Sequence, residues 1–177
     1  MSIIMVAMLD MNDGLGDAYG NLLFDLPKDM ARFKLLTTGK HVVMGRKTWD
    51  SLPVKPLPKR KNYVLTKDKS FEVKGRTKVL HSKDEVLEMA KSKDVYVIGG
   101  GEIYKEFMPH ADTMYLTFVH SVNPMARVFF PDISLDEWYI DKTMMQKHEQ
   151  DKEHSHSFTF ATYKRIAPAP TKDQAQE

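Results

Sequence analysis

The sequence contains no cysteine, which excludes disulfides, thiolate nucleophiles and cysteine-based metal sites. It also lacks any stretch that approaches the ~20 consecutive apolar residues of a membrane-spanning helix. The apolar start, residues 1–9, is short, has no basic leader and ends at Asp10, so we expect no signal peptide. These absences predict a cytoplasmic protein without a membrane partner, and the lack of cysteine is compatible with a reducing compartment.

A large excess of either charge is also absent, because 26 basic and 24 acidic side chains leave a net charge of +2. This balance argues against a nucleic-acid partner. The 177 residues fit one domain, and a chain of this length buries enough surface to fold without a metal or a disulfide. We expect a monomeric domain over residues 1–166 and a disordered, polar tail over 167–177.

Apolar strands and helical segments alternate through the first two-thirds of the chain, which favours a layered α/β fold. The nearly continuous apolar run 2–9 is typical of a strand that is buried on both faces. The glycine-containing segment 10–25 is predicted to be a long mobile loop. The last third is predicted to be antiparallel, ending in a strand over 157–164. Helices are predicted over 27–37, 47–51, 83–91 and from the glycines at 99–101 to 108.

The predicted helix 27–37 carries a carboxylate on its apolar side. At ~100° per residue, the apolar stripe consists of Leu26, Met30 and Phe33, with Leu36 at its edge. Asp29 falls on this stripe, whereas the charges of Lys28 and Arg32 are predicted to point elsewhere. One interpretation is an acid in the first helical turn, where the helix dipole favours it. The other is a carboxylate that faces a pocket, with a raised pKa and a hydrogen-bonding function.

Two strand-to-helix turns carry residues suited to phosphate. Arg46, Lys47 and Thr48 follow a short apolar strand and open a helix, and both helix N-termini and arginine side chains bind anions. The glycines at 99–101 follow another strand and allow a ligand to approach the backbone closely. Their spacing matches neither the dinucleotide fingerprint nor the P-loop. A solvated basic turn capped by Thr48 and a tight glycine turn are the simpler interpretations.

Other polar residues also have two interpretations. Arg60 lies in a Pro-rich segment and is either solvated or fixed to hold a substrate carboxylate. Thr117 lies in a strand pattern, where threonine is common. His148, His154 and His156 lie in or beside a charged loop and are predicted to be solvated, so no metal site is predicted.

Taken in order, these segments resemble dihydrofolate reductase from Ser2 to about Ile166. The motifs are LPKDMARFK, MGRKTWDSL, PLPKRKN, VIGGGEIY, YLTFV, FFPD and a closing FTFATYKR. The resemblance implies a three-layer α/β fold with a central, mixed, mostly parallel eight-stranded sheet, about four flanking helices and an antiparallel C-terminal strand pair. It also implies an oxidoreductase that uses NADPH to reduce 7,8-dihydrofolate to 5,6,7,8-tetrahydrofolate, supplying one-carbon metabolism and thymidylate synthesis.

The resemblance also implies functions for matching positions. Asp29 would bond the pterin and promote protonation of its N5, supported by Thr117, and Phe24 would lie in the neighbouring loop. Arg60 would hold the α-carboxylate of the substrate's glutamate. The folate pocket would be lined by Met5, Ala7, Met30, Phe33, Leu52, Leu57 and Ile98. NADPH would contact Ala7, Leu15, Gly16, Gly45, Arg46, Lys47, Thr48, Thr66, Lys67, Gly100, Gly101, Glu102, Ile103 and Tyr104. A cis peptide bond is implied between Gly99 and Gly100.

The chain departs from the family pattern in three places. Phe24 stands where tryptophan is usual and lacks the indole N–H donor. The loop 13–24 is slightly longer, which affects its expected closure over the nicotinamide. Glu102 stands where some members carry a basic residue, which leaves Arg46 as the main phosphate anchor.

Two other functions remain open at this point. One is a reductase of the same fold that acts on a pyrimidine precursor of riboflavin, although Asp29, Phe33 and Arg60 suit a pterin with a glutamyl tail better. The other is a structural subunit that binds folate or NADPH with little turnover.

Overall fold

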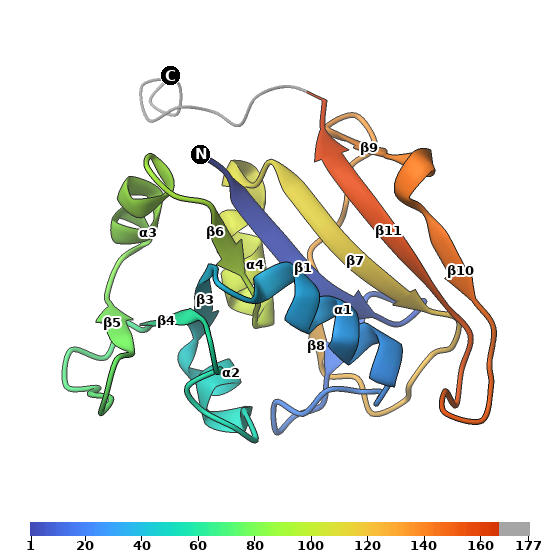
Figure 1. Ribbon diagram of the computed structural model, residues 1–177, viewed down its shortest axis with the longest axis horizontal. Helices are drawn as coiled ribbons and strands as arrows, with labels where there is room; N and C mark the ends of the chain where they lie inside the picture. The colour runs from blue at the N-terminus through green and yellow to red at the C-terminus, as the bar shows by residue number, and fades with distance from the viewer. Residues whose placement is uncertain (167–177) are drawn as a thin grey trace.

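A computed structural model of the chain describes residues 1–166, and the predicted tail, 167–177, lies outside the described residues. The described chain folds around one large sheet with helices on both sides (Figure 1). Its strands follow the order β10-β11-β7-β1-β6-β3-β4-β5, and β9 pairs with the C-terminal end of β11 as a ninth strand. The strands of this sheet are β1 Ile3–Leu9, β3 His41–Gly45, β4 Lys61–Leu65, β5 Lys78–Leu80, β6 Val95–Val97, β7 Thr113–Val119, β9 Trp138–Ile140, β10 Gln146–His148 and β11 Phe158–Arg165.

The sheet is parallel on one side and antiparallel on the other. From β5 to β7 along the order every neighbouring pair is parallel. Strand β11 runs antiparallel to β7, β9 and β10. This confirms the predicted mixed, mostly parallel fold with eight strands in its main path, to which the structure adds the short β9.

Helices bury both faces of the sheet. They are α1 Pro27–Thr37, α2 Arg46–Ser51, α3 Lys83–Ala90 and α4 Gly101–Phe107, with short 3-10 turns η1 Met108–His110 and η2 Lys142–Met144. Alternate residues of β1 point to opposite faces, and the first set, Ile3, Met5, Ala7 and Leu9, packs in the core that contains the buried residues of α3 and α4. The second set, Ile4 and Val6, packs in the core that contains Trp49 of α2 and contacts α1. The predicted strand buried on both faces is therefore confirmed.

Local signals set the helix boundaries. Ser82 caps α3, because its Oγ accepts from the Glu85 N–H while the Glu85 carboxylate accepts from the Ser82 N–H, a complete capping box. Helix α1 begins at Pro27, as predicted. Its N-cap, Leu26, provides no side-chain cap, so the first turn depends on distant groups.

The segment 10–25, predicted to be a loop throughout, contains a short strand. This strand, β2 Gly14–Gly16, pairs antiparallel with β8 Val128–Phe129 and forms a second, two-stranded sheet. A three-residue strand with two glycines has no detectable hydrophobic alternation, so the sequence pattern could not indicate it. The pairing attaches the first half of the loop to the segment that follows β7.

Candidate functional site

The predicted site residues lie where the parallel strands end. Arg46 directly follows β3, Thr66 directly follows β4, and the glycines at 99–101 come just after β6. In open α/β sheets, ligands bind outside the carboxyl ends of the strands. Segments that are far apart in the sequence therefore meet at one edge of the sheet (Figure 1).

Asp29 lies in the first turn of α1, and its carboxylate faces β7. The Thr117 hydroxyl donates to Asp29 Oδ1 at 2.6 Å. Thr117 itself is buried, and Asp29 is partly buried. The structure thus brings together the two residues that were expected to act as a pair.

Arg32 also faces this region, and the prediction that its charge points elsewhere is wrong. Its guanidinium lies 4.5 Å from the ring centroid of Phe160 and donates through Nη1 to the Leu116 carbonyl at 3.3 Å. It is held between α1 and the strands β7 and β11 by these contacts. Because Arg32 lies one turn after Asp29, its positive charge acts on that carboxylate.

The pKa of Asp29 is set by opposing influences. Burial raises it above its ordinary value, while the Thr117 hydrogen bond and the Arg32 charge act in the opposite direction without cancelling the increase. The nearby Tyr104 is fully buried in α4, and its hydroxyl donates to the Val6 carbonyl at 2.6 Å. Burial, followed by the negative charge of Asp29, raises the pKa of Tyr104 as well. Burial thus moves the titration of both groups to higher pH.

The residues predicted to line the folate pocket fall into two groups. Phe33, Leu52, Leu57 and Ile98 are partly buried and pack around one core, and Met30 leaves 48% of its surface exposed. Met5 and Ala7 instead belong to the core on the other face of β1, and Met5 is completely buried. The first group forms an apolar surface on the α1 and α2 side of the sheet, whereas Met5 is buried within the core on the other side.

Arg60 is fixed by the end of α1. Its Nε donates to Thr37 Oγ1 at 2.8 Å, its Nη1 donates to the Pro58 carbonyl at 2.9 Å, and its guanidinium lies 5.6 Å from the centre of the Phe33 ring. Within residues 1–166 its Nη2 has no hydrogen bond to the protein. The side chain therefore presents a charged edge in a fixed orientation, which suits a carboxylate.

The glycine turn after β6 packs against the start of α2. The Gly45 N–H donates to the Gly99 carbonyl at 2.8 Å, and the implied cis peptide bond between Gly99 and Gly100 is present. A Cβ on Gly100 would lie 3.3 Å from Thr48 Oγ1, and a Cβ on Gly45 would lie 2.9 Å from Ile103. A side chain at either glycine would therefore crowd its neighbours in the place where the two turns pack together.

Arg46 already has acidic neighbours. Its Nη1 lies 2.8 Å from Asp68 Oδ2, its Nε lies 3.7 Å from Asp50 Oδ2, and its guanidinium lies 4.7 Å from the centre of the Phe71 ring. The hydrogen bonds from Ser70, followed by the Arg46 charge, lower the pKa of Asp68. This acid was not predicted from the sequence.

The other predicted cofactor residues differ in exposure. Lys47, Lys67 and Glu102 are exposed, whereas Thr48, Thr66, Gly100, Gly101 and Ile103 are partly buried. Leu15 and Gly16 are buried in β2. The exposed charged residues and the glycines at 45 and 99–101 border the same end of the sheet.

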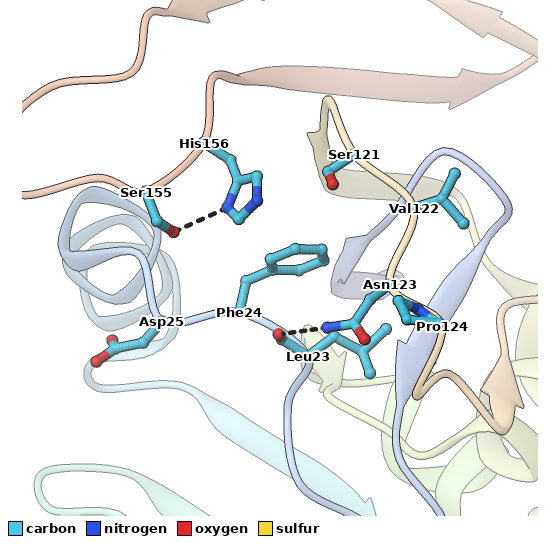
Figure 2. A pocket seen from close by; sticks show the side chains of 9 residues that line it. All are labelled: Leu23, Phe24, Asp25, Ser121, Val122, Asn123, Pro124, Ser155 and His156. Atoms are coloured by element: carbon cyan, nitrogen blue, oxygen red, sulfur yellow. Dashed lines mark hydrogen bonds between the residues drawn. The ribbon is translucent and has the colours of Figure 1, made fainter.

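Phe24 lies in the segment that leads into α1. Figure 2 shows its ring between His156 and the segment 121–124, and the Phe24 and His156 rings meet edge to face with centroids 5.1 Å apart. These residues line an open hollow of about 340 Å³. Phe24 also packs against a small core that contains Leu26 and Phe158. At the position where the family usually carries tryptophan, Phe24 therefore packs against neighbouring rings and apolar residues.

Three histidines lie in the hairpin formed by β10 and β11, residues 146–165, and the prediction that they are solvated is wrong. His154 is only 1% exposed, and its Nε2 accepts a hydrogen bond from the Lys28 N–H of α1 at 3.1 Å. His148 and His156 are partly buried. Within residues 1–166, no group of three or more histidines and acids could hold a metal ion. No helix in this range is both long and apolar enough to span a bilayer.

Comparison with known proteins agrees with this arrangement. The family model for dihydrofolate reductase matches residues 2–165. The chain belongs to the dihydrofolate reductase family. It is 31% identical to the dihydrofolate reductase of Bacillus subtilis, over 92% of this chain and 94% of that protein. It is 32% identical to that of Haemophilus influenzae, over 93% of this chain and 100% of that protein.

A solved structure of a dihydrofolate reductase gives the same result. The enzyme from Enterococcus faecalis, complexed with NADP(H) and RAB-propyl, superposes with a TM-score of 0.86 at 27% identity, covering 94% of this chain and 97% of that one. The predicted family, the three-layer fold, the class of NADPH-dependent oxidoreductase and the reduction of dihydrofolate are therefore confirmed.

Proposed function

We propose that Asp29 is the residue that makes reduction of 7,8-dihydrofolate to tetrahydrofolate efficient in this protein, by promoting protonation of the pterin N5. The observation that carries the proposal is the partly buried carboxylate held at 2.6 Å by Thr117, with its pKa raised by burial. A carboxylate in such surroundings interacts strongly with a protonated ring. Solvent delivers the proton, and Asp29 stabilises it on the substrate.

The surrounding residues orient the substrate. The apolar surface formed by Phe33, Leu52, Leu57 and Ile98 suits a flat aromatic ring system. The fixed edge of Arg60 suits the glutamate α-carboxylate. The distance along α1 between Asp29 in its first turn and Thr37, which holds Arg60 from its last turn, allows one elongated ligand to contact both.

The cofactor supplies the hydride, and this chain's residues fit its binding. Glycines at positions 45 and 100 let the two strand-to-helix turns pack closely, and a glycine backbone allows a ligand to approach it closely. Arg46, Lys47 and Thr48 offer charge and hydroxyl groups to its phosphates. Leu15, Gly16, Thr66, Lys67 and residues 100–104 border the same surface.

Substitution of Asp29 tests the central proposal. Asp29→Asn should reduce turnover strongly at neutral pH and less at low pH, where protons come freely from solvent. The matched control is Asp25→Asn, an exposed acid four residues earlier. The assay is the loss of NADPH absorbance in the near ultraviolet when protein, cofactor and dihydrofolate are mixed. Near-normal turnover of Asp29→Asn at neutral pH would show that the role belongs to another group.

The ion pair between Arg46 and Asp68 bears on cofactor choice. Arg46 should read the 2′-phosphate of NADPH, so catalytic efficiency should be higher with NADPH than with NADH. Asp68→Asn removes a negative charge 2.8 Å from this arginine and should lower the KM for NADPH about two- to fivefold, while Asp50→Asn, whose contact is 3.7 Å, should have a smaller effect. Equal efficiency with both cofactors would contradict the role of Arg46.

We propose further that the protein works as a cytoplasmic monomer without a nucleic-acid partner, in keeping with its net charge of +2. Light scattering coupled to size exclusion tests the oligomeric state.

A further inference from the structure

Helix α1 lacks a cap from its own sequence. The first N–H groups of a helix have no partner within it and need an acceptor from elsewhere. The N-cap residue, Leu26, has no side-chain oxygen, and Pro27, the first helical residue, has no N–H to satisfy. The first N–H group of α1 that needs an outside acceptor is therefore that of Lys28, directly before Asp29.

The acceptor comes from the other end of the chain. His154 Nε2 lies 3.1 Å from the Lys28 nitrogen, although the two residues are 126 positions apart. His154 is 1% exposed, and its ring packs at a tilt against that of Phe158 at the start of β11, with centroids 5.3 Å apart. An imidazole nitrogen thus occupies the place that a serine or aspartate oxygen usually takes at a helix N-terminus.

The tautomer of His154 follows from its partners. A backbone N–H only donates, so Nε2 must be unprotonated to accept from Lys28. A carboxylate only accepts, so Nδ1 carries the proton that it donates to Asp151 Oδ1 at 2.7 Å. Asp151 also accepts from the N–H groups of Glu153 and His154, which fixes its orientation. The contact with Asp151 is therefore a hydrogen bond from a neutral ring, and it holds the ring in the capping form.

A second contact attaches the same hairpin to the entry of α1. The His156 ring meets the Phe24 ring edge to face, and Ser155 donates to or accepts from His156 Nδ1 at 2.8 Å (Figure 2). His154 and His156 thus contact the chain on both sides of Leu26, at Lys28 and at Phe24. Leu26 itself is 1% exposed. The segment 154–156 therefore contributes contacts on both sides of the start of α1.

We propose that His154 is a positioning residue that caps α1 and so holds Asp29 in register with Thr117. The proposal rests on the function proposed for Asp29. The Asp29 carboxylate follows the capped N–H by one residue, and its bond to Thr117 at 2.6 Å tolerates little movement of the turn. Loss of the cap frees the first turn of α1, which moves the carboxylate away from the position where the pterin N5 needs it.

Matched variants test this proposal. His154→Leu fills the buried space but accepts no hydrogen bond, whereas His154→Gln keeps an acceptor and a donor. The hydride-transfer rate, measured in single turnovers at saturating NADPH and dihydrofolate, should fall about 10- to 100-fold in His154→Leu and recover most of that loss in His154→Gln. The exposed neighbour offers the control Glu153→Ala, which should leave the rate unchanged.

The background of Asp29→Asn separates positioning from general stability. If His154 acts through Asp29, His154→Leu should change the residual rate of Asp29→Asn less than twofold. An equal loss in both backgrounds, or equal rates for His154→Leu and His154→Gln, would overturn the proposal. Normal turnover of Asp29→Asn alone would instead overturn the function proposed for Asp29. If His154→Leu does not fold, Asp151→Ala at an exposed position provides the test. This substitution removes the acceptor that keeps the proton of His154 on Nδ1. It should reduce the rate several-fold in the wild-type background and leave the rate of Asp29→Asn unchanged.

Discussion

Replacing Asp29 by asparagine should stabilise the folded protein while it reduces activity. Burial raises the pKa of Asp29, so between the unfolded and folded pKa values the folded protein binds more protons than the unfolded chain. Stability is therefore lost as the pH rises through this window, and the penalty is complete above the raised pKa. Below the unfolded pKa of about 3.9 the penalty is absent. Asparagine carries no charge at any pH and can still accept the Thr117 hydrogen bond through its carbonyl oxygen.

The expected gain is about 0.5–2 kcal/mol at pH 7, the range typical of a single stabilising substitution. For a chain of 177 residues each kcal/mol raises Tm by roughly 2–4 °C. Thermal unfolding of the wild type, Asp29→Asn and the exposed control Asp25→Asn should be followed by circular dichroism from pH 3 to pH 8. The gain should appear only in Asp29→Asn and disappear toward pH 3. An Asp29→Asn protein that is no more stable at pH 7, or equally stabilised at both extremes, would refute this reasoning.

Three further substitutions test the contacts around the site. Arg32→Met removes a positive charge that lowers the pKa of Asp29, so the pH-rate profile of hydride transfer should move to higher pH, whereas exposed Lys34→Met should leave it unchanged. Tyr104→Phe deprives a buried β1 carbonyl of its 2.6 Å donor and should reduce the free energy of unfolding in urea by about 1–3 kcal/mol; an unchanged value would mean that water replaces the hydroxyl. Gly101→Ala places a Cβ 2.7 Å from a β8 methyl group, so we expect a loss of about 1–3 kcal/mol in the same measurement, unless β8 moves at no cost.

Features with a local cause were predicted well from the sequence. The apolar run of β1 predicted a strand buried on both faces, and the helices predicted to begin at residues 27 and 83 begin there as α1 and α3. The short strands β2, β8 and β9 have two or three residues each. Segments of this length contain less than two periods of alternation, so their pairing depends on contacts that form only in the folded chain.

The environment of polar side chains was predicted less well. A helical projection of α1 correctly placed Asp29, but it directed the charge of Arg32 away from the apolar stripe. In the structure Arg32 is partly buried and its guanidinium lies over the ring of Phe160, a residue 128 positions away along the chain. His154 was missed for the same reason, since its partner Lys28 is remote in sequence. Only the packing of β11 and its hairpin against α1 reveals either contact.

The two missed residues explain how an acid on the inner side of a helix is tolerated. A partly buried carboxylate tends to take up a proton, and a neutral Asp29 could not stabilise a protonated pterin. Thr117 and Arg32 both favour the charged form, although burial still raises the pKa. His154 adds no charge to this balance, because it accepts from Lys28 as a neutral ring. One group of neighbours therefore sets the charge of Asp29 and another sets its position. Substitutions of Arg32 should shift the pH dependence, whereas substitutions of His154 should reduce the rate most at neutral pH, where the reaction depends on Asp29.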